Sequence, residues 1–199
     1  NHKNGQFGLY AGVTEEAQAV YLVRRFIESF TLPIAVTCQY DFIDDYGSSE
    51  NHDESNFGLI RADHSPKPSY LAIQRMNALF NGQVFDKTTY VAVEKDELHR
   101  SAKRRILVEN WDKVSVTADN GVKAFPFKND ATPNERMLAV WSALPYSREF
   151  NNRITTLRVK GWGGFAAKPV AIDIITGKSY SVPMRVEGDD ILLSNLSLK

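Results

Sequence analysis

An apolar run at Ile34–Tyr40 lies between two segments whose apolar residues recur at helical spacing, and this order constrains the fold most. The first segment, Thr14–Phe30, opens with an N-capping threonine and two glutamates that suit the positive end of the helix dipole. The second starts near Pro68, a residue suited to the first helical position, and ends at Gly82. A nearly continuous apolar run is typical of a strand buried on both faces of a parallel sheet. Helix, buried strand, long loop and helix together predict an α/β architecture.

After Gly82 the pattern changes to short runs of β-forming residues separated by polar turns. An Asp-Asn-Gly turn at 119–121 and a Thr-Gly-Lys turn at 176–178 are typical of hairpins. Regular spacing of such runs predicts an antiparallel β-sandwich. We therefore expect α/β followed by all-β, with domains at residues 1–82 and 83–199. The predicted strands are Thr88–Val93, Arg105–Asn110, Ser115–Ala118, Val122–Phe127, Met137–Ala143, Thr155–Val159, Val170–Ile175, Ser179–Val186 and Ile191–Asn195.

Charge and cysteine content limit the classes of partner. Lysine plus arginine and aspartate plus glutamate balance at 24 each, so nothing electrostatic favours nucleic acid or an anionic membrane as a partner. No apolar run approaches the roughly 18 residues of a membrane span, and no signal-peptide pattern opens the chain. The single cysteine, Cys38, excludes an internal disulfide and is expected to be a buried structural thiol. Cysteine usage therefore does not indicate a compartment.

Four short motifs follow one another between residues 40 and 70: Tyr-Asp-Phe at 40–42, Asp-Asp-Tyr-Gly at 44–47, Glu-Ser-Asn-Phe-Gly-Leu at 54–59 and Lys-Pro-Ser-Tyr at 67–70. This order resembles the last βα unit of the clan A retaining glycoside hydrolases, (β/α)8 barrel enzymes that include families 39 and 5. Their pattern is Trp-Tyr-Asp-Trp, an Asp-Asp-Gly loop, Glu-x-x-Phe-Gly-Leu and Lys-Pro-x-Tyr. The resemblance covers about the first 80 residues, whereas a barrel needs about 250. It implies the end of a barrel, completed by an upstream segment and followed by an accessory β-sandwich.

The resemblance also implies a reaction. The parent protein would hydrolyse O-glycosidic bonds of oligo- or polysaccharides by retaining double displacement, which needs two carboxyl groups about 5 Å apart. In this clan both are glutamates at the ends of strands four and seven, so both are expected upstream of Asn1. The clan's acid/base follows an asparagine, as in Asn134-Glu135, but the polar residues around that dipeptide indicate a surface turn. The resemblance favours a secreted, periplasmic or cell-surface location.

The substrate-binding residues implied by the resemblance lie at the end of the last barrel strand and in the loop after it. Gln39 stands where the family has a tryptophan that stacks on the sugar, and it has no ring to stack. One of Tyr40, Phe42 or Tyr46 replaces that ring, or the site is degenerate; alternatively Tyr40 and Phe42 only close the barrel. The candidate residues are Gln39, Tyr40, Asp41, Phe42, Tyr46 and Glu54.

Acidic residues cluster in the loop between Asp44 and Glu54. A solvated loop is the favoured interpretation, and hydrogen bonding to sugar hydroxyls or calcium binding are the functional ones. Glu54 matches the family glutamate and is expected either to contact sugar or to hold the loop, for example by pairing with Arg61. No histidine has metal-ligand spacing with another histidine or with cysteine, so neither metal nor cofactor is predicted.

Two other classes of function fit the sequence. The sandwich is alternatively a carbohydrate-binding module in which Trp111, Trp141 or Trp162 presents a stacking face, although Trp141 is expected in the core. The parent is alternatively a non-catalytic scaffold, as the loss of the tryptophan suggests. The basic run at 99–105 is interpreted as a solvated loop, with binding of a charged polysaccharide as the alternative.

Overall fold

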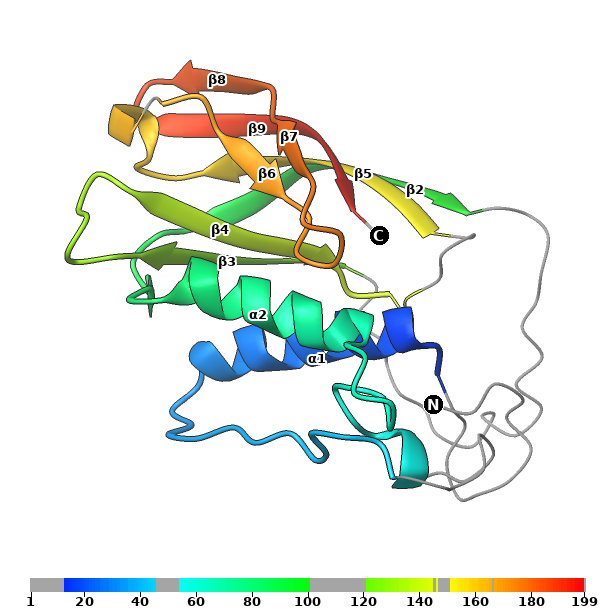
Figure 1. The fold of residues 1–199 in the computed structure, drawn as a ribbon. Coiled ribbons are helices and arrows are strands. Elements are labelled where there is room, and N and C mark those ends of the chain that lie inside the picture. Colours follow the sequence, from blue (N-terminus) through cyan, green and yellow to red (C-terminus); the bar gives the residue numbers. More distant parts are fainter. Residues whose placement is uncertain are drawn as a thin grey trace. The chain divides into compact units, whose positions relative to one another are not determined.

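The chain folds as drawn in Figure 1, a computed structural model. It divides into two compact units, Asn1–Val84 with Ala171–Tyr180 and Phe85–Val170 with Ser181–Lys199. Among the described residues no helix has the length and apolar character needed to cross a bilayer. The structure describes residues 13–45, 54–100, 121–144, 146, 151–165 and 167–198.

Two helices of the first unit, α1 (Glu15–Phe30) and α2 (Pro68–Phe80), lie side by side and confirm the two predicted helices (Figure 1). The hydroxyl of Thr14 accepts a hydrogen bond of 3.2 Å from the amide of Ala17 and so caps α1. The side chains that the helices bury recur three or four residues apart, as one face of a helix requires. They include Ala19, Val20, Val23 and Ile27 of α1 and Ala72 and Met76 of α2.

The segment between the helices differs from the prediction at Ile34–Tyr40. It lacks regular secondary structure, and within the described part of the chain no strand pairs with it, so the predicted buried strand is wrong for this chain. Ile34 and Val36 are exposed, and Cys38, predicted to be buried, is exposed as well. An apolar strand becomes buried only where neighbouring strands and helices cover it, and the apolar pattern by itself does not supply those neighbours.

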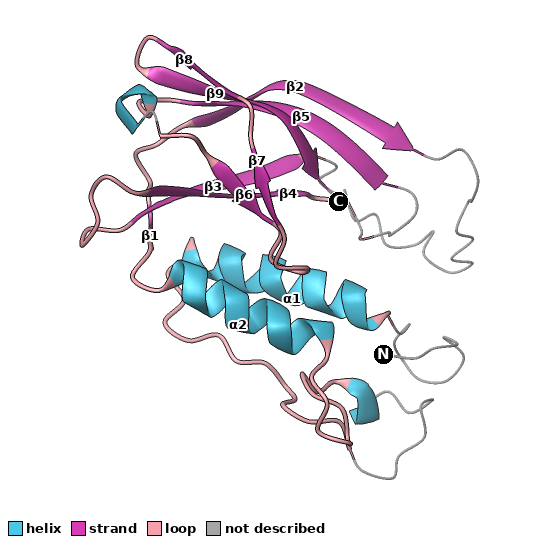
Figure 2. Ribbon diagram, turned by 45° about the horizontal axis from the view of Figure 1, so that its top comes forward, coloured by secondary structure: helices cyan, strands magenta, loops and turns pink. Residues whose placement is uncertain are grey.

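The second unit is mostly β, with strands coloured magenta in Figure 2. Its larger sheet has the order β2-β5-β9-β8 and its smaller sheet the order β1-β3-β4; β6 and β7 form a separate pair, most of which belongs to the first unit. The pairings β2 with β5, β5 with β9, β8 with β9 and β3 with β4 are antiparallel, which confirms the predicted type of strand pairing. The strands are β1 (Val84–Phe85), β2 (Val91–Arg100), β3 (Val122–Lys128), β4 (Arg136–Ser142), β5 (Asn151–Val159), β6 (Val170–Ile172), β7 (Ser179–Ser181), β8 (Met184–Glu187) and β9 (Asp190–Leu198).

A cluster of buried side chains on the larger sheet forms the core of the second unit. Val159 of β5 and Leu193 of β9 lie in this cluster together with Trp162. Leu138 of β4 packs against it, so side chains of both sheets share one core, as in a β-sandwich. Trp141 is buried, as the sequence predicted.

Strand β2 begins and ends later than the predicted strand Thr88–Val93, because charged residues continue it. Nε of Arg158 lies 2.5 Å from a carboxylate oxygen of Glu94, and Nε of Arg153 lies 3.2 Å from one of Asp96. Both arginines belong to the neighbouring strand β5. Opposite charges on paired strands stabilise a sheet, so a charged run is compatible with this strand.

Two further boundaries differ from the sequence prediction. Strand β2 includes His99 and Arg100, for which the predicted loop is wrong, while the rest of that basic run lies outside the described residues. The predicted strand Ser179–Val186 is divided into β7 and β8, because Pro183 lies between them and has no N–H to donate to a ladder. The predicted strands outside the described residues are Arg105–Asn110 and Ser115–Ala118.

The turn between β6 and β7 belongs to the first unit, although it lies far along the sequence. The carboxylate of Asp173 accepts a hydrogen bond of 2.9 Å from the amide of Ile175 and fixes the turn. Arg75 of α2 donates hydrogen bonds to the carbonyl oxygens of Ile174 and Ile175, at 3.2 and 2.8 Å. The turn is therefore attached to α2. The order of strands along the sequence does not predict this attachment.

Candidate functional site

The candidate site lies on the segment after α1, where the exposure of side chains alternates. The intervening residues are half-buried, whereas four residues form what we call the exposed face: Val36, Cys38, Tyr40 and Phe42. Alternation with a period of two is that of an extended strand, whose successive side chains point to opposite sides. Tyr40 is 71% exposed and Phe42 is 57% exposed, so two of the predicted site residues share this face.

Gln39 lies between the residues of the exposed face and contacts α1. A terminal nitrogen of Arg25 donates a hydrogen bond of 2.6 Å to the side-chain oxygen of Gln39. The same nitrogen lies 3.5 Å from the carbonyl oxygen of Cys38. The structure therefore separates Gln39, which is engaged with the helix, from Tyr40 and Phe42.

A second ring supports each exposed ring of the site. The ring centroids of Tyr40 and Phe57 are 6.3 Å apart, and those of Phe42 and Tyr70 are 6.4 Å apart. Both pairs are edge-to-face, an arrangement that aromatic quadrupoles favour. Phe57 and Tyr70 come from the Phe-Gly-Leu and Lys-Pro-Ser-Tyr motifs, so these motifs supply the support for the exposed rings.

The two aspartates at 41 and 44 have different partners. Asp41 is half-buried; its carboxylate accepts a hydrogen bond from the next amide, and its own amide donates to the carbonyl oxygen of Phe57 at 3.4 Å. Asp44 places one carboxylate oxygen 2.6 Å from Nζ of Lys67 and 2.9 Å from the amide nitrogen of Gly58. Asp44 is therefore part of the internal structure of the loop, while Asp41 lies next to the exposed rings.

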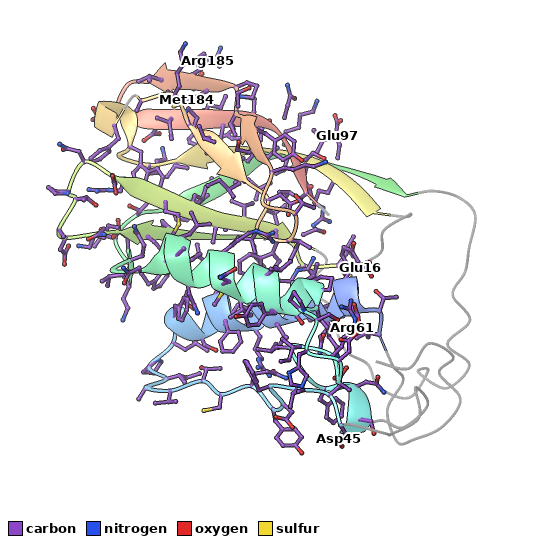
Figure 3. All side chains as sticks on the ribbon, in the orientation of Figure 1. Glu16, Asp45, Arg61, Glu97, Met184 and Arg185 are labelled. Atoms are coloured by element: carbon purple, nitrogen blue, oxygen red, sulfur yellow. The ribbon has the colours of Figure 1, made fainter. Side chains whose placement is uncertain are left out.

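Arg61 attaches the end of the loop to the first turn of α1 (Figure 3). Nε and a terminal nitrogen of Arg61 donate to the two carboxylate oxygens of Glu15, at 2.9 and 2.5 Å. This hydrogen-bonded pairing with Glu15 raises the pKa of the Arg61 guanidinium. The sequence suggested Glu54 as a partner of Arg61; the structure shows Arg61 paired with Glu15, and a pairing with Glu54 stays a prediction because the side chain of Glu54 is not described.

Two candidate residues are not placed by the structure. Tyr46 lies outside the described residues, and Glu54 begins the short 3-10 helix Glu54–Asn56 without a described side chain. Contact of sugar with any of the six candidate residues stays a prediction. In the part of the chain that is described, no group of three or more His, Cys, Asp and Glu side chains is arranged to hold a metal ion.

Sequence reasoning missed Gln18 altogether. Its side-chain nitrogen lies 3.2 Å from the carbonyl oxygen of Phe57 and 3.3 Å from that of Gly58, and its side-chain oxygen accepts a hydrogen bond of 3.1 Å from Ser69. A glutamine on an amphipathic helix gives no signal of such a contact. The sequence shows Lys67 only as part of the Lys-Pro-Ser-Tyr motif, and no sequence pattern indicates that its ammonium group is buried.

The described candidates for a catalytic acid or for a sugar-stacking ring in the second unit have other, structural positions. Glu135 is exposed in a turn, where its carboxylate accepts a hydrogen bond of 2.8 Å from the hydroxyl of Thr132, which confirms the surface turn. Trp162 is 6% exposed and Trp141 is also buried, so neither presents an open stacking face. Trp111 lies outside the described residues.

Comparison with known proteins gives a likeness of fold. No family model and no curated protein matches the sequence. Among solved structures, the chain is similar to a family 39 glycoside hydrolase from the gut symbiont Bacteroides cellulosilyticus WH2, with a TM-score of 0.54 and 24% sequence identity. The similarity covers 94% of this chain and 29% of that chain, so this chain spans less than a third of the length of its neighbour. The chain therefore has the fold of one part of a glycoside hydrolase chain.

Proposed function

We propose that this chain is the C-terminal portion of a glycoside hydrolase that cleaves O-glycosidic bonds of oligo- or polysaccharides with retention. The likeness of fold to a family 39 glycoside hydrolase over 94% of the chain supports the proposal. The order of the four motifs between residues 40 and 70 supports it independently. The first unit then supplies the last helices of a (β/α)8 barrel and the segment after α1, which would become its last strand only beside the remaining strands, and the second unit is its accessory β-sandwich.

The exposed face is the observation that carries this proposal. Contiguous exposed apolar side chains mark surfaces that a partner covers. In a (β/α)8 barrel, alternating side chains of each strand fill the interior while the helices surround the barrel. Here α1 contacts one side of the segment through Arg25 and Gln39. The exposed face is on the other side and is apolar or aromatic, as the interior residues of a barrel are. The remainder of the barrel is the proposed partner of this face.

The rings of the exposed face are the proposed contacts for sugar. Tyr40 and Phe42 lie where a barrel strand would end, which is the face of a barrel that holds active sites. The C–H faces of a sugar ring pack on an aromatic plane, so Tyr40 is a better stacking residue than Gln39, which is engaged with α1. Asp41, Tyr46 and Glu54 are proposed to hydrogen-bond sugar hydroxyls.

The chemistry is proposed to reside in two glutamates of the remaining barrel. One carboxylate attacks the anomeric carbon while the other carboxyl group protonates the departing glycosidic oxygen, and a glycosyl-enzyme ester forms. The second group then removes a proton from water, which attacks the anomeric carbon and releases the first carboxylate. Glu135, in its surface turn, has no role in this scheme.

Expression of the full-length product of the gene that contains this sequence tests the proposal. We expect that product to hydrolyse at least one member of a panel of p-nitrophenyl glycosides. Tyr40→Ala should raise KM about 10-fold, because loss of a stacked ring removes about 1.4 kcal/mol of binding. Tyr90→Ala is the matched control, since Tyr90 is 65% exposed in the second unit and should leave KM unchanged.

The contrary outcomes separate the alternatives. A folded full-length product that hydrolyses no glycoside in the panel contradicts the proposed reaction. Polysaccharide binding without hydrolysis would favour a carbohydrate-binding or scaffold role instead. In the binding-module alternative, Trp141 and Trp162 are too buried to stack on sugar, which leaves Trp111, outside the described residues, as the tryptophan that such a module would use.

A further inference from the structure

Lys67 is a charged side chain that is almost completely buried, with 1% of its surface exposed. Its ammonium group lies 2.6 Å from a carboxylate oxygen of Asp44 and 3.1 Å from the carbonyl oxygen of Asn56. Burying an ammonium group is costly unless an opposite charge and hydrogen-bond acceptors replace water. The two partners belong to the two ends of the loop, which we call the first stem (residues 41–45) and the second stem (residues 54–60). Lys67 therefore bridges the stems.

The stems also bond to each other directly. The carbonyl oxygen of Phe42 accepts hydrogen bonds of 3.0 Å from the amides of Leu59 and Ile60, and the amide of Asp44 donates to the carbonyl oxygen of Ile60 at 3.0 Å. The amide of Gly58 donates to the same carboxylate oxygen of Asp44 that pairs with Lys67. One oxygen atom thus joins the buried ammonium group to the backbone of the second stem.

The helix α1 holds the second stem independently of Lys67. Gln18 donates to the carbonyl oxygens of Phe57 and Gly58, and its oxygen accepts a hydrogen bond from the buried hydroxyl of Ser69. Ser69 lies in the first turn of α2, two residues after Lys67. Gln18 therefore fixes the second stem to α1 and is itself bonded to α2, while the first stem is fixed to the second by backbone bonds and by Asp44.

We propose that Lys67 is a positioning residue for the exposed rings of the site. Acting through Asp44, it locks the first stem in place, and with it the main chain that carries Tyr40 and Phe42. The inference rests on the proposed function, because a ring that stacks on sugar binds best when its position is set before binding. Lys67 has no open surface with which to touch a sugar itself. The Lys-Pro motif then serves to orient the rings.

Hydrogen exchange on the 199-residue chain tests the positioning role without any sugar. In Lys67→Met, the stem amides of Asp44, Gly58, Leu59 and Ile60 should exchange at least 10-fold faster, while α2 amides from Ala72 onward keep their rates. Unchanged stem amides would overturn the proposal. An equal acceleration throughout α1 and α2 would also overturn it, since that reports a general loss of stability.

Lys160→Met is the matched control for this experiment. It removes an ammonium group that lies 2.9 Å from a carboxylate oxygen of Asp190 in the second unit, where it is largely exposed. The stem amides should keep their rates in this variant. Accelerated stem amides in Lys160→Met would contradict the assignment, because the effect would then not be specific to Lys67.

Asp44→Asn keeps the proposal testable if Lys67→Met does not fold. The asparagine retains the shape and an acceptor oxygen for the amide of Gly58, but it removes the charge that faces Lys67. The stem amides should again exchange faster than in the parent chain, and identical rates would overturn the proposal.

The full-length protein gives a second readout. Lys67→Met should raise KM for a hydrolysed p-nitrophenyl glycoside about 10-fold, with kcat changed less than threefold, as expected for misplaced binding rings. A lowered kcat with unchanged KM would contradict positioning of a binding surface. If the parent protein hydrolyses none of these glycosides, the proposed function fails, while hydrogen exchange still decides whether Lys67 holds the stems.

Discussion

The indole nitrogen of Trp162 donates a hydrogen bond of 3.1 Å to the hydroxyl of Thr89. That hydroxyl in turn donates to the carboxylate of Asp86 at 2.6 Å, so the indole, the hydroxyl and the carboxylate form a chain of hydrogen bonds. This series of hydrogen bonds joins the beginning of the second unit to its core cluster. It explains why a tryptophan in a glycine-rich loop is buried, since both its ring and its N–H have partners inside the unit.

Removal of the Trp162 ring should therefore destabilise the second unit. Trp162→Ala is expected to lower the free energy of unfolding by about 3–5 kcal/mol, the range for truncating a buried aromatic side chain. Chemical denaturation measures this loss. Tyr90→Ala, at an exposed position of the same unit, should change stability by no more than about 0.5 kcal/mol. Unchanged stability of Trp162→Ala, with weakened polysaccharide binding, would instead identify Trp162 as a ligand contact.

Asp86 should make the second unit sensitive to acid. Burial by itself raises the pKa of this carboxyl group, but hydrogen bonds from Thr88 and Thr89 outweigh burial and hold its pKa below the ordinary value of 3.8. Because the pKa is lower in the folded state, the stabilisation is complete above the unfolded pKa and is lost as pH falls through the folded pKa. We expect the free energy of unfolding to decrease below about pH 4.

Asp86→Asn isolates this contribution to the pH dependence. Glu187 and Asp190 also have lowered pKa values, because of hydrogen bonds from Arg158 and Lys160 respectively, so the parent and the variant must be compared at each pH. The stability difference between them should shrink as pH falls below about 4, since protonation removes the same charge from the parent. A difference that stays constant from pH 7 to pH 2 would contradict the role given to Asp86.

Gly58 should not accept even a methyl group. A Cβ atom there would lie 2.4 Å from the amide nitrogen of Asp44, 2.5 Å from the carbonyl carbon of Ile43 and 2.7 Å from the carbonyl oxygen of Ile60. All three atoms are backbone and cannot move aside as a flexible side chain would. Gly58→Ala should therefore destabilise the first unit by about 3 kcal/mol, the upper end of the usual range for overpacking, in thermal or chemical unfolding.

Gly164→Ala provides the control for that substitution, because a Cβ atom at Gly164 meets nothing within 4 Å. This variant should unfold like the parent chain. Similar stability of both variants would show that the stems do not approach each other as closely as these distances indicate.

Arg75 should hold the turn between β6 and β7. Arg75→Ala removes hydrogen bonds to two carbonyl oxygens, each worth about 1 kcal/mol. The amide of Gly177, which donates to the carbonyl oxygen of Asp173, is then expected to exchange about 10-fold faster with solvent. Arg185→Ala removes an arginine of β8 in the second unit and should leave that rate unchanged (Figure 3). Equal exchange rates of the Gly177 amide in the parent chain and in Arg75→Ala would show that Arg75 does not hold this turn.

Local signals were sufficient to predict the two helices of this chain. The cap at Thr14 and the proline at position 68 located both helices, because capping and proline geometry depend only on nearby residues. Burial of Ile34–Tyr40 was predicted wrongly, because burial of a strand depends on neighbours that the local sequence does not describe. Strand β2 was predicted too short, since its charged residues are compatible with a sheet only through partners on β5.

The position of the candidate site stays a prediction, whereas the orientation of its residues is an observation that the motifs alone did not supply. The motifs predict a sugar site around Tyr40 and Phe42. The alternation of a strand implies that the side chain of Gln39 points to the opposite side from both rings. The side of the segment that contacts α1 is set by Arg25, which lies 14 residues before Gln39. The contact of Gln18 with Phe57 spans 39 residues, and a separation of that kind leaves no local signal.

Alkylation of Cys38 tests most directly the claim that a barrel covers the exposed face. The reaction of this single thiol with iodoacetamide should be followed by mass spectrometry of the peptide that contains it, in the 199-residue chain and in the full-length gene product. We predict that the thiol reacts readily in the chain alone and at least 100-fold more slowly in the folded full-length protein, with equal rates after denaturation. Equal rates in the two folded proteins would contradict the account, because the exposed face would then be open to solvent in both.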